Sequence, residues 1–139
     1  MDWRQGAHAS TFGGNPVAIA AALTTIRLVK EQYMENAERI GEYIFSRLAT
    51  WPGQYRIVGD VRGKGLMIGI EIVKDKKTKE PAPALRDAIE TLAFMKGVLV
   101  LGAGANTIRL APPLVIDREQ ADFAIGALAS SIEEAQALP

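Results

Sequence analysis

Two hydroxyl side chains stand just ahead of a glycine pair and a helix start, a combination that could bind a phosphate. In STFGGNP (residues 10–16), Ser10 and Thr11 precede the glycines, and Asn15 with Pro16 marks the start of a helix. Hydroxyls and unpaired backbone N–H groups at a helix N-terminus are good donors to a phosphate. The same residues also suit a plain glycine turn with a helix cap, and the Lys-Ser/Thr pair of a P-loop is missing. The local pattern leaves both interpretations open.

An arginine inside an apolar run is the second candidate. Arg109 lies in TIRLAPP (residues 107–113), and its guanidinium has to reach a polar environment. At a strand end beside a cleft, it would bind a carboxylate or phosphate through two parallel hydrogen bonds. Alternation along a strand fits an outward, solvated arginine equally well.

Two further polar features have simpler interpretations. Arg62 and Lys64 alternate with glycines in RGKG (residues 62–65), which is typical of a solvated turn. Glu71 lies in an apolar run, where an edge-strand position is favoured over an inward, paired carboxylate.

Hydrophobic periodicity and helix breakers predict the elements that would position these residues. We predict helices over residues 17–29, 32–49 and 84–96, and a last helix from an Asp117 cap to about residue 135. We predict strands over residues 55–61, 66–73, 98–101 and 107–110, with a bulge or bend at the glycines of residues 62–65. The first helix is apolar nearly all round, which predicts that a neighbour covers it.

This order of elements predicts an α/β (α+β) domain with a small, mainly antiparallel sheet and helices packed on one face. The 139 residues suit a single core. Sixteen basic and sixteen acidic residues give no net charge, so neither nucleic acid nor a membrane surface is an expected partner. The absence of cysteine excludes thiolate sites and is compatible with a cytoplasmic location, and a single histidine, His8, excludes a multi-histidine metal site.

Taken together, three ordered segments are far more specific than any one of them. GAHASTFGGNP (residues 6–16), GDVRGKGLM (residues 59–67) and NTIRLAPPL (residues 106–114) follow one another along the chain. This order resembles the C-terminal part of class III (ω-amino acid) aminotransferases, particularly 4-aminobutyrate aminotransferase and its acetylornithine and ornithine relatives.

The resemblance implies the C-terminal domain of a fold type I, pyridoxal-phosphate-dependent enzyme that forms a homodimer with active sites at the subunit interface. It divides the chain into a phosphate-binding segment of the cofactor domain (1–14), linking helices (15–50) and a C-terminal small domain (51–139). It also implies that Thr11, assisted by Ser10, contacts the cofactor phosphate bound by the neighbouring subunit, and that Arg109 holds a substrate carboxylate.

For the complete enzyme, the resemblance implies transfer of an amino group from an ω-amino acid such as 4-aminobutyrate to 2-oxoglutarate. The cofactor lysine of the family lies upstream of the Ser-Thr pair, and no lysine precedes Ser10. We therefore assign no catalytic residue here and expect the chain to be inactive by itself. The alternatives are a non-catalytic binding or oligomerisation module, an acetylornithine or ornithine aminotransferase, and an aminomutase or racemase of the same fold.

Overall fold

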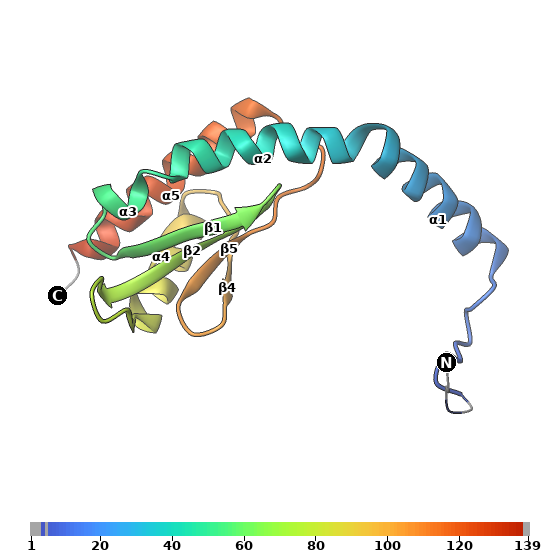
Figure 1. Cartoon of the computed structure of the whole chain (residues 1–139), viewed down its shortest axis with the longest axis horizontal. Helices are drawn as coiled ribbons and strands as arrows, with labels where there is room; N and C mark the ends of the chain where they lie inside the picture. The colour runs from blue at the N-terminus through green and yellow to red at the C-terminus, as the bar shows by residue number, and fades with distance from the viewer. Residues whose placement is uncertain (1–3, 5, 138–139) are drawn as a thin grey trace.

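A small sheet domain with one long projecting helix makes up the part of the chain that the computed structural model describes, residues 4 and 6–137 (Figure 1). Residues 6–15 lie at the far end of that helix, away from the sheet. In chain order the elements are α1 (Pro16–Leu28), a π-helical turn η1 (Val29–Tyr33), α2 (Met34–Leu48), α3 (Trp51–Gln54), β1 (Val58–Lys64), β2 (Met67–Asp75), β3 (Glu80–Pro81), α4 (Pro83–Met95), β4 (Leu101–Ala103), β5 (Thr107–Leu110) and α5 (Arg118–Gln136).

The sheet is antiparallel throughout, as predicted. Its strands lie in the order β1-β2-β5-β4, and the two-residue β3 pairs with the C-terminal end of β2. Strand β2 is therefore flanked on both sides, by β1 and β5. The edge position favoured for Glu71 from the sequence is wrong, because β5 returns from far along the chain to cover that side of β2.

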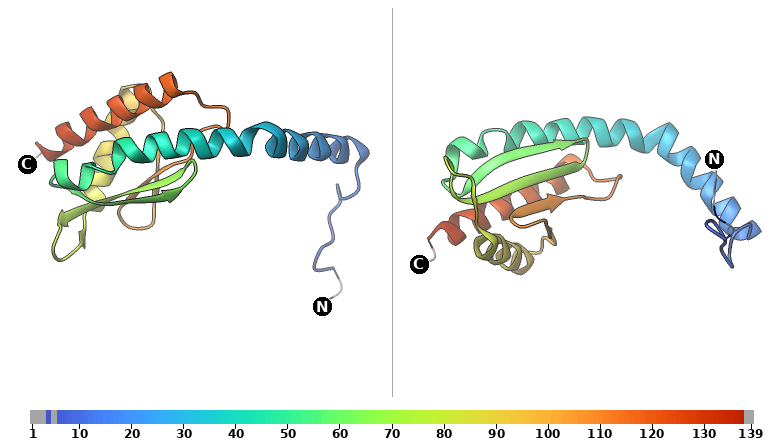
Figure 2. Two further views of the ribbon diagram at one scale, coloured as in Figure 1. Left: turned by 45° about the horizontal axis from the view of Figure 1, so that its top comes forward. Right: turned by 60° about the horizontal axis from the view of Figure 1, so that its bottom comes forward.

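One face of the sheet is buried under helices, also as predicted. Alternate residues of β2, namely Ile68, Ile70 and Ile72, are almost fully buried and pack with Ile108 of β5 in the core. Helices α2, α4 and α5 lie together on this face of the sheet (Figure 2). Burying each such side chain contributes roughly 1.5–3 kcal/mol, so the β2 isoleucines anchor the sheet to its helical layer. None of the described helices is long and apolar enough to cross a membrane.

Both predicted helix caps are confirmed. The side chain of Asn15 accepts the backbone N–H groups of Val17 and Ala18 at the start of α1. Asp117 forms a reciprocal capping box with Gln120 at the start of α5. These contacts satisfy helix-end donors that otherwise have no partner within the helix.

The two helices predicted over residues 17–29 and 32–49 are instead one continuous helix over residues 16–48. No glycine or proline lies between Pro16 and Gly41, so nothing in the sequence breaks the helix; η1 only adds a wider turn within it. No residue of α1 is buried, and Val17 is 76% exposed. Within residues 4 and 6–137, the expected neighbour of α1 is therefore not supplied.

Two predicted strand boundaries are also wrong. Residues 62–64 continue β1 instead of forming a turn, because a two-residue connection at Gly65 and Leu66, with φ of +55° at the glycine, is enough to reverse the chain. The strand predicted over 98–101 lies later, at β4. Its register is set by pairing with β5 across a turn that Gly104 enters with φ of +60°.

Close backbone contact fixes the β1–β2 hairpin against α2. A side chain at Gly41 of α2 would overlap with the backbone carbonyl group of Gly65 at the hairpin tip. A glycine in a helix interior is otherwise unfavourable by about 0.5–1 kcal/mol relative to alanine. Gly41 is therefore explained by this contact and not by helix propensity.

We predict that Gly41→Ala lowers the free energy of unfolding by about 2 kcal/mol, because the added methyl group forces the hairpin away from α2. The matched control is Gly126→Ala in α5, where nothing lies within 4 Å of the added carbon. That variant should be more stable by about 0.5–1 kcal/mol. Urea unfolding of both chains checks the pair, and equal stabilisation by the two substitutions would contradict the proposed contact.

Candidate functional site

The face of the sheet opposite the helices carries the polar residues that could meet a ligand. Because side chains alternate along a strand, burial of the β2 isoleucines places Gly69 and Glu71 on the other face. In the register of the sheet, Gly69 lies between Arg62 of β1 and Arg109 of β5. Arg62 and Arg109 thus flank a position without a side chain on the face of the sheet opposite the helices, which we call the open face.

Arg109 lies in the middle of β5, next to the fully buried Ile108, and its side chain is exposed on this open face. Among residues 4 and 6–137, no hydrogen-bond or ion-pair partner is found for its guanidinium. The predicted placement of Arg109 in a strand is confirmed, and its guanidinium is accessible to an anion. Its role as a carboxylate anchor stays a prediction.

The side chain of Arg62, by contrast, forms hydrogen bonds and ion pairs with its neighbours. Its Nη1 lies 3.2 Å from Oδ2 of Asp60 and 3.9 Å from Oε1 of Glu71, and its Nη2 lies 3.3 Å from Oγ1 of Thr107. Lys79 approaches the other oxygen, Oε2, of Glu71 at 3.5 Å. The solvated-turn interpretation of Arg62 is therefore wrong, because the residue lies within β1 and its side chain reaches across β2 to β5.

This polar network, formed by Asp60, Arg62, Glu71, Lys79 and Thr107, was not predicted from the sequence. Its members come from β1, β2, β5 and the turn before β3, and up to 45 residues separate hydrogen-bonded partners. The only available signal was a lone carboxylate in an apolar run, which does not identify its partners.

A tight turn holds Lys79 in place. The side chain of Asp75 accepts the backbone N–H groups of Lys77 and Thr78, and these hydrogen bonds, chiefly that from Thr78, hold the pKa of Asp75 below its ordinary value. The carboxylate therefore supports the turn above its unfolded-state pKa, and this support is lost as the pH falls through the lowered folded-state pKa. Lys79 itself has a φ of 57°, rare for a residue with a side chain, and donates to the carbonyl of Gly59 at 2.7 Å.

At the other end of the molecule, Ser10 and Thr11 lie in an exposed turn ahead of α1. The backbone N–H of Gly13 donates to the carbonyl of Ser10 at 3.1 Å, and both hydroxyls are exposed. The expectation of unpaired backbone N–H donors at this helix start is wrong for two of these groups. Two N–H groups at the start of α1 are taken by the Asn15 cap, so they are not available to a phosphate.

The structure does not bring the two predicted contact sites together. The bent helix over residues 16–48, about 50 Å long along its axis at roughly 1.5 Å per residue, separates Ser10 and Thr11 from the sheet that carries Arg109 (Figure 1). One copy of the chain therefore holds the two sites at opposite ends. Residues 1–3 and 5 of the predicted segment 1–14 lie outside the described residues.

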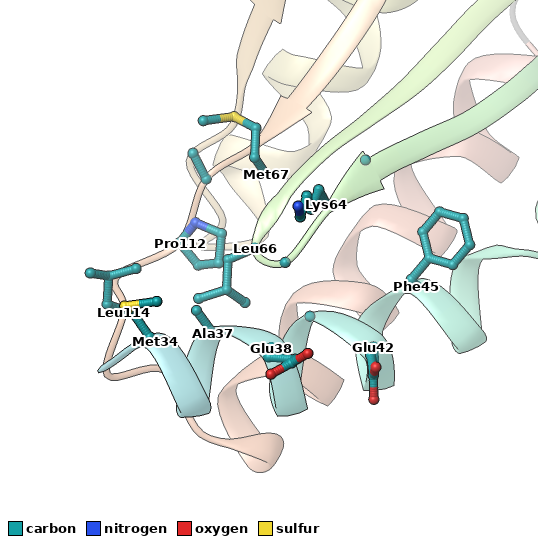
Figure 3. A pocket seen from close by; sticks show the side chains of 14 residues that line it. Met34, Ala37, Glu38, Glu42, Phe45, Lys64, Leu66, Met67, Pro112 and Leu114 are labelled. Carbon is teal, nitrogen blue, oxygen red and sulfur yellow. The ribbon is translucent and has the colours of Figure 1, made fainter. Parts of the chain in front are cut away.

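A groove of about 770 Å³ lies between α2, the tip of the β1–β2 hairpin and the segment after β5 (Figure 3). Lys64 and Leu66 of the hairpin and Pro112 line it, so it joins parts of two of the three sequence segments. Arg109, Ser10 and Thr11 do not line this groove. In the described part of the chain, no group of three or more histidine, aspartate or glutamate residues could hold a metal ion.

Comparison with known proteins identifies the family. Residues 1–132 match the family described as Aminotransferase class-III. The chain belongs to the class-III aminotransferase family. Proteins similar to this chain include a leucine/methionine racemase of Thermococcus litoralis, 39% identical over 130 residues that make up 93% of this chain and 29% of the racemase. An ornithine aminotransferase of Bordetella pertussis is 39% identical over 128 residues, 91% of this chain and 29% of that enzyme.

Solved structures of transaminases agree with the fold described here. An amine transaminase from an uncultivated Pseudomonas species, solved in a PLP-bound form, superposes with a TM-score of 0.86 at 36% identity. The match covers 94% of this chain and 30% of that one. The chain therefore has the α/β fold of part of a fold type I enzyme, and it spans less than a third of the length of the relatives it matches.

We predict that the two arginines of the open sheet face differ in their effect on folding. Arg109→Gln should change the free energy of unfolding by less than about 0.5 kcal/mol, because the side chain has no partner among the described residues. Arg62→Gln should lower it by about 1 kcal/mol, because Thr107 and two carboxylates lose a donor. Urea unfolding of both variants measures the difference; a larger loss for Arg109→Gln would show that the structural roles are reversed.

Proposed function

We propose that this chain forms part of a pyridoxal-phosphate-dependent aminotransferase that moves an amino group from an ω-amino acid, such as 4-aminobutyrate, to 2-oxoglutarate. The observation that carries the proposal is Arg109, an exposed guanidinium without a protein partner among the described residues, on the open face of the sheet. Membership of the class-III family supports the reaction type. The choice of amino donor rests on the sequence resemblance alone.

In this proposal, Arg109 binds the carboxylate that the amino donor and the oxo-acid acceptor have in common. A guanidinium offers paired N–H donors that match the two oxygens of a carboxylate. Holding that end of the substrate orients the reacting carbon and reduces the entropy lost on reaching the transition state. Because both substrates contain a carboxylate, one anchor serves both halves of the reaction.

We also propose that the N-terminal turn binds the phosphate of the cofactor. Ser10 and Thr11 present two exposed hydroxyl donors beside the start of α1, whose first turn contains no acidic residue. The positive end of the helix dipole favours an anion at this place. When bound, the cofactor supplies the electron-withdrawing ring on which amino-group transfer depends. In this chain, the two hydroxyls would hold the phosphate and fix its orientation.

We further propose that the complete enzyme is a homodimer. The turn with Ser10 and Thr11 lies far from Arg109 within one copy, so a site that uses both needs a second copy. The exposed apolar surface of α1, including Val17 and Leu23, offers area for such an assembly. The cytoplasmic location stays an expectation from the composition.

Co-expression with the upstream part of the enzyme tests the proposed function. We expect the reassembled protein to transfer amino groups to 2-oxoglutarate from 4-aminobutyrate, and the chain alone to show no turnover. Arg109→Gln should raise the KM for carboxylate substrates by about ten- to a hundred-fold, which corresponds to the loss of a charged hydrogen-bonded pair. Failure of the two parts to associate would instead favour the non-catalytic module.

A second experiment tests the phosphate contact through the helix cap. Asn15→Asp keeps a good N-cap but places a negative charge at the start of α1, four residues after Thr11. We predict that the reassembled enzyme then binds pyridoxal phosphate about ten-fold more weakly, whereas the chain unfolds at an unchanged urea concentration. Asn15→Ser, which retains the cap without the charge, is the matched control. Equal affinity in all three proteins would place the phosphate elsewhere.

The racemase alternative has support of its own, since a leucine/methionine racemase and an alanine/serine racemase are each 39% identical to this chain. The ornithine aminotransferase alternative is supported in the same way. Assay of the reassembled enzyme with single enantiomers separates these activities. Inversion of an amino acid without any oxo acid indicates a racemase, and dependence on 2-oxoglutarate indicates an aminotransferase, whose preferred donor then distinguishes ornithine from 4-aminobutyrate.

A further inference from the structure

Arg109 has a potential ion-pair partner in its own sheet. Glu71 pairs with Thr107, and Gly69 pairs with Arg109, so Glu71 and Arg109 are diagonal neighbours on the open face of adjacent strands. Diagonal neighbours are about 7–8 Å apart at their Cα atoms, a separation that long side chains can bridge. An ion pair between them would occupy the guanidinium and compete with any carboxylate ligand.

In the structure, Glu71 is held by other cations instead. Its Oε1 lies 3.9 Å from Arg62 and its Oε2 lies 3.5 Å from Lys79. The side chain of Glu71 is only 21% exposed, whereas those of Arg62 and Lys79 are about half exposed. The least solvated charged member of the network is thus a carboxylate with a cation at each oxygen.

The geometry around Glu71 also keeps these cations in place. The Arg62 guanidinium is fixed between Asp60 and Thr107, and Lys79 is fixed by the carbonyl of Gly59. A side chain at Gly59 would come within 2.9 Å of Oε2 of Glu71, so this glycine leaves the space that the carboxylate occupies. The network is therefore built around Glu71.

The charges balance within this network. Asp60 and Glu71 offset Arg62 and Lys79, so no carboxylate of the network is left over for Arg109. Arg62 and Arg109 also flank the same residue, Gly69, from opposite sides, and their like charges oppose a movement of Arg109 toward β1.

We propose that Arg62 and Lys79 are positioning residues that occupy the Glu71 carboxylate and so keep the Arg109 guanidinium available for the carboxylate of a substrate. The consequence for substrate binding rests on the proposed function of Arg109. The pairing itself is a property of this chain and can be tested without activity. If either cation is removed, Glu71 gains a free oxygen and turns to Arg109.

The first test uses NMR of the 139-residue chain labelled with ¹⁵N, with the Nε–Hε signal of Arg109 assigned by its loss in Arg109→Lys. We expect that signal to shift in Arg62→Gln and to return to its original position in Arg62→Gln/Glu71→Gln. Lys79→Gln, which frees the other oxygen, should act in the same direction. Lys64→Gln removes a charge from the same face of β1 without contacting Glu71 and should leave the signal unchanged. An Arg109 signal that is unaffected in both Arg62→Gln and Lys79→Gln overturns the proposal.

The second test measures the consequence in the reassembled enzyme. Arg62→Gln should raise the KM for the oxo acid by roughly three- to five-fold, the effect of an exposed competing ion pair, with kcat unchanged. Adding Glu71→Gln should restore the original KM. If Arg62 and Glu71 only stabilised the fold, the double variant would bind the oxo acid still more weakly than Arg62→Gln. The absence of rescue therefore overturns the proposal.

Arg109→Gln separates the two hypotheses. If it leaves the KM for carboxylates unchanged, the proposed function fails while the NMR experiment still decides the pairing of Glu71. If it raises the KM but Arg62→Gln does not, the proposed function stands and the present inference fails.

Discussion

One-sided burial of strand β2 is the constraint on which the rest of the structure depends. Ile68, Ile70 and Ile72 enter the core beneath three helices. Because side chains alternate along a strand, Gly69 and Glu71 must then lie on the opposite face. A slip of the register by one residue would bury the carboxylate and expose the isoleucines, at a cost of several kcal/mol. The same apolar contacts that stabilise the fold therefore decide which side chains can meet a ligand.

The helices were largely predictable from the sequence because their determinants are local. Asn15 and Asp117 cap the helices where expected, and the bounds of α4 and α5 differ from the prediction by only a residue or so. The break expected near residue 30 is absent, because a polar stretch alone, without glycine or proline, does not end a helix. The strands were less predictable, since β4 obtains its position from pairing with β5 and not from its own residues.

The residues of the candidate site also divide into those that the sequence predicted and those that it did not. Ser10, Thr11 and Arg109 were found from the sequence because each belongs to a distinctive short segment, although their roles stay predictions. The network around Glu71 was not found, because Arg62, Lys79 and Thr107 meet it only when β1, the turn and β5 have come together. Alternation within β1 was hidden by its glycines, which led to the interpretation of Arg62 as a turn residue. Contacts made by folding across 45 residues leave no local pattern.

The similarity of this chain to proteins of different activity has a physical explanation under the proposed function. The chain is 39% identical to a racemase and 39% identical to an ornithine aminotransferase. Amino acids, whether racemised or transaminated, share a carboxylate, and a guanidinium on an open sheet face recognises that group without regard to the rest of the molecule. Under the proposed function, a network that keeps Arg109 unpaired would leave the anchor available in each case, although the carboxylate lies next to the reacting carbon of a racemised amino acid and several carbons from that of an ω-amino acid. Under the proposed function, selection between these substrates would therefore depend on the distance from Arg109 to the reacting carbon and on the residues that contact the rest of the substrate.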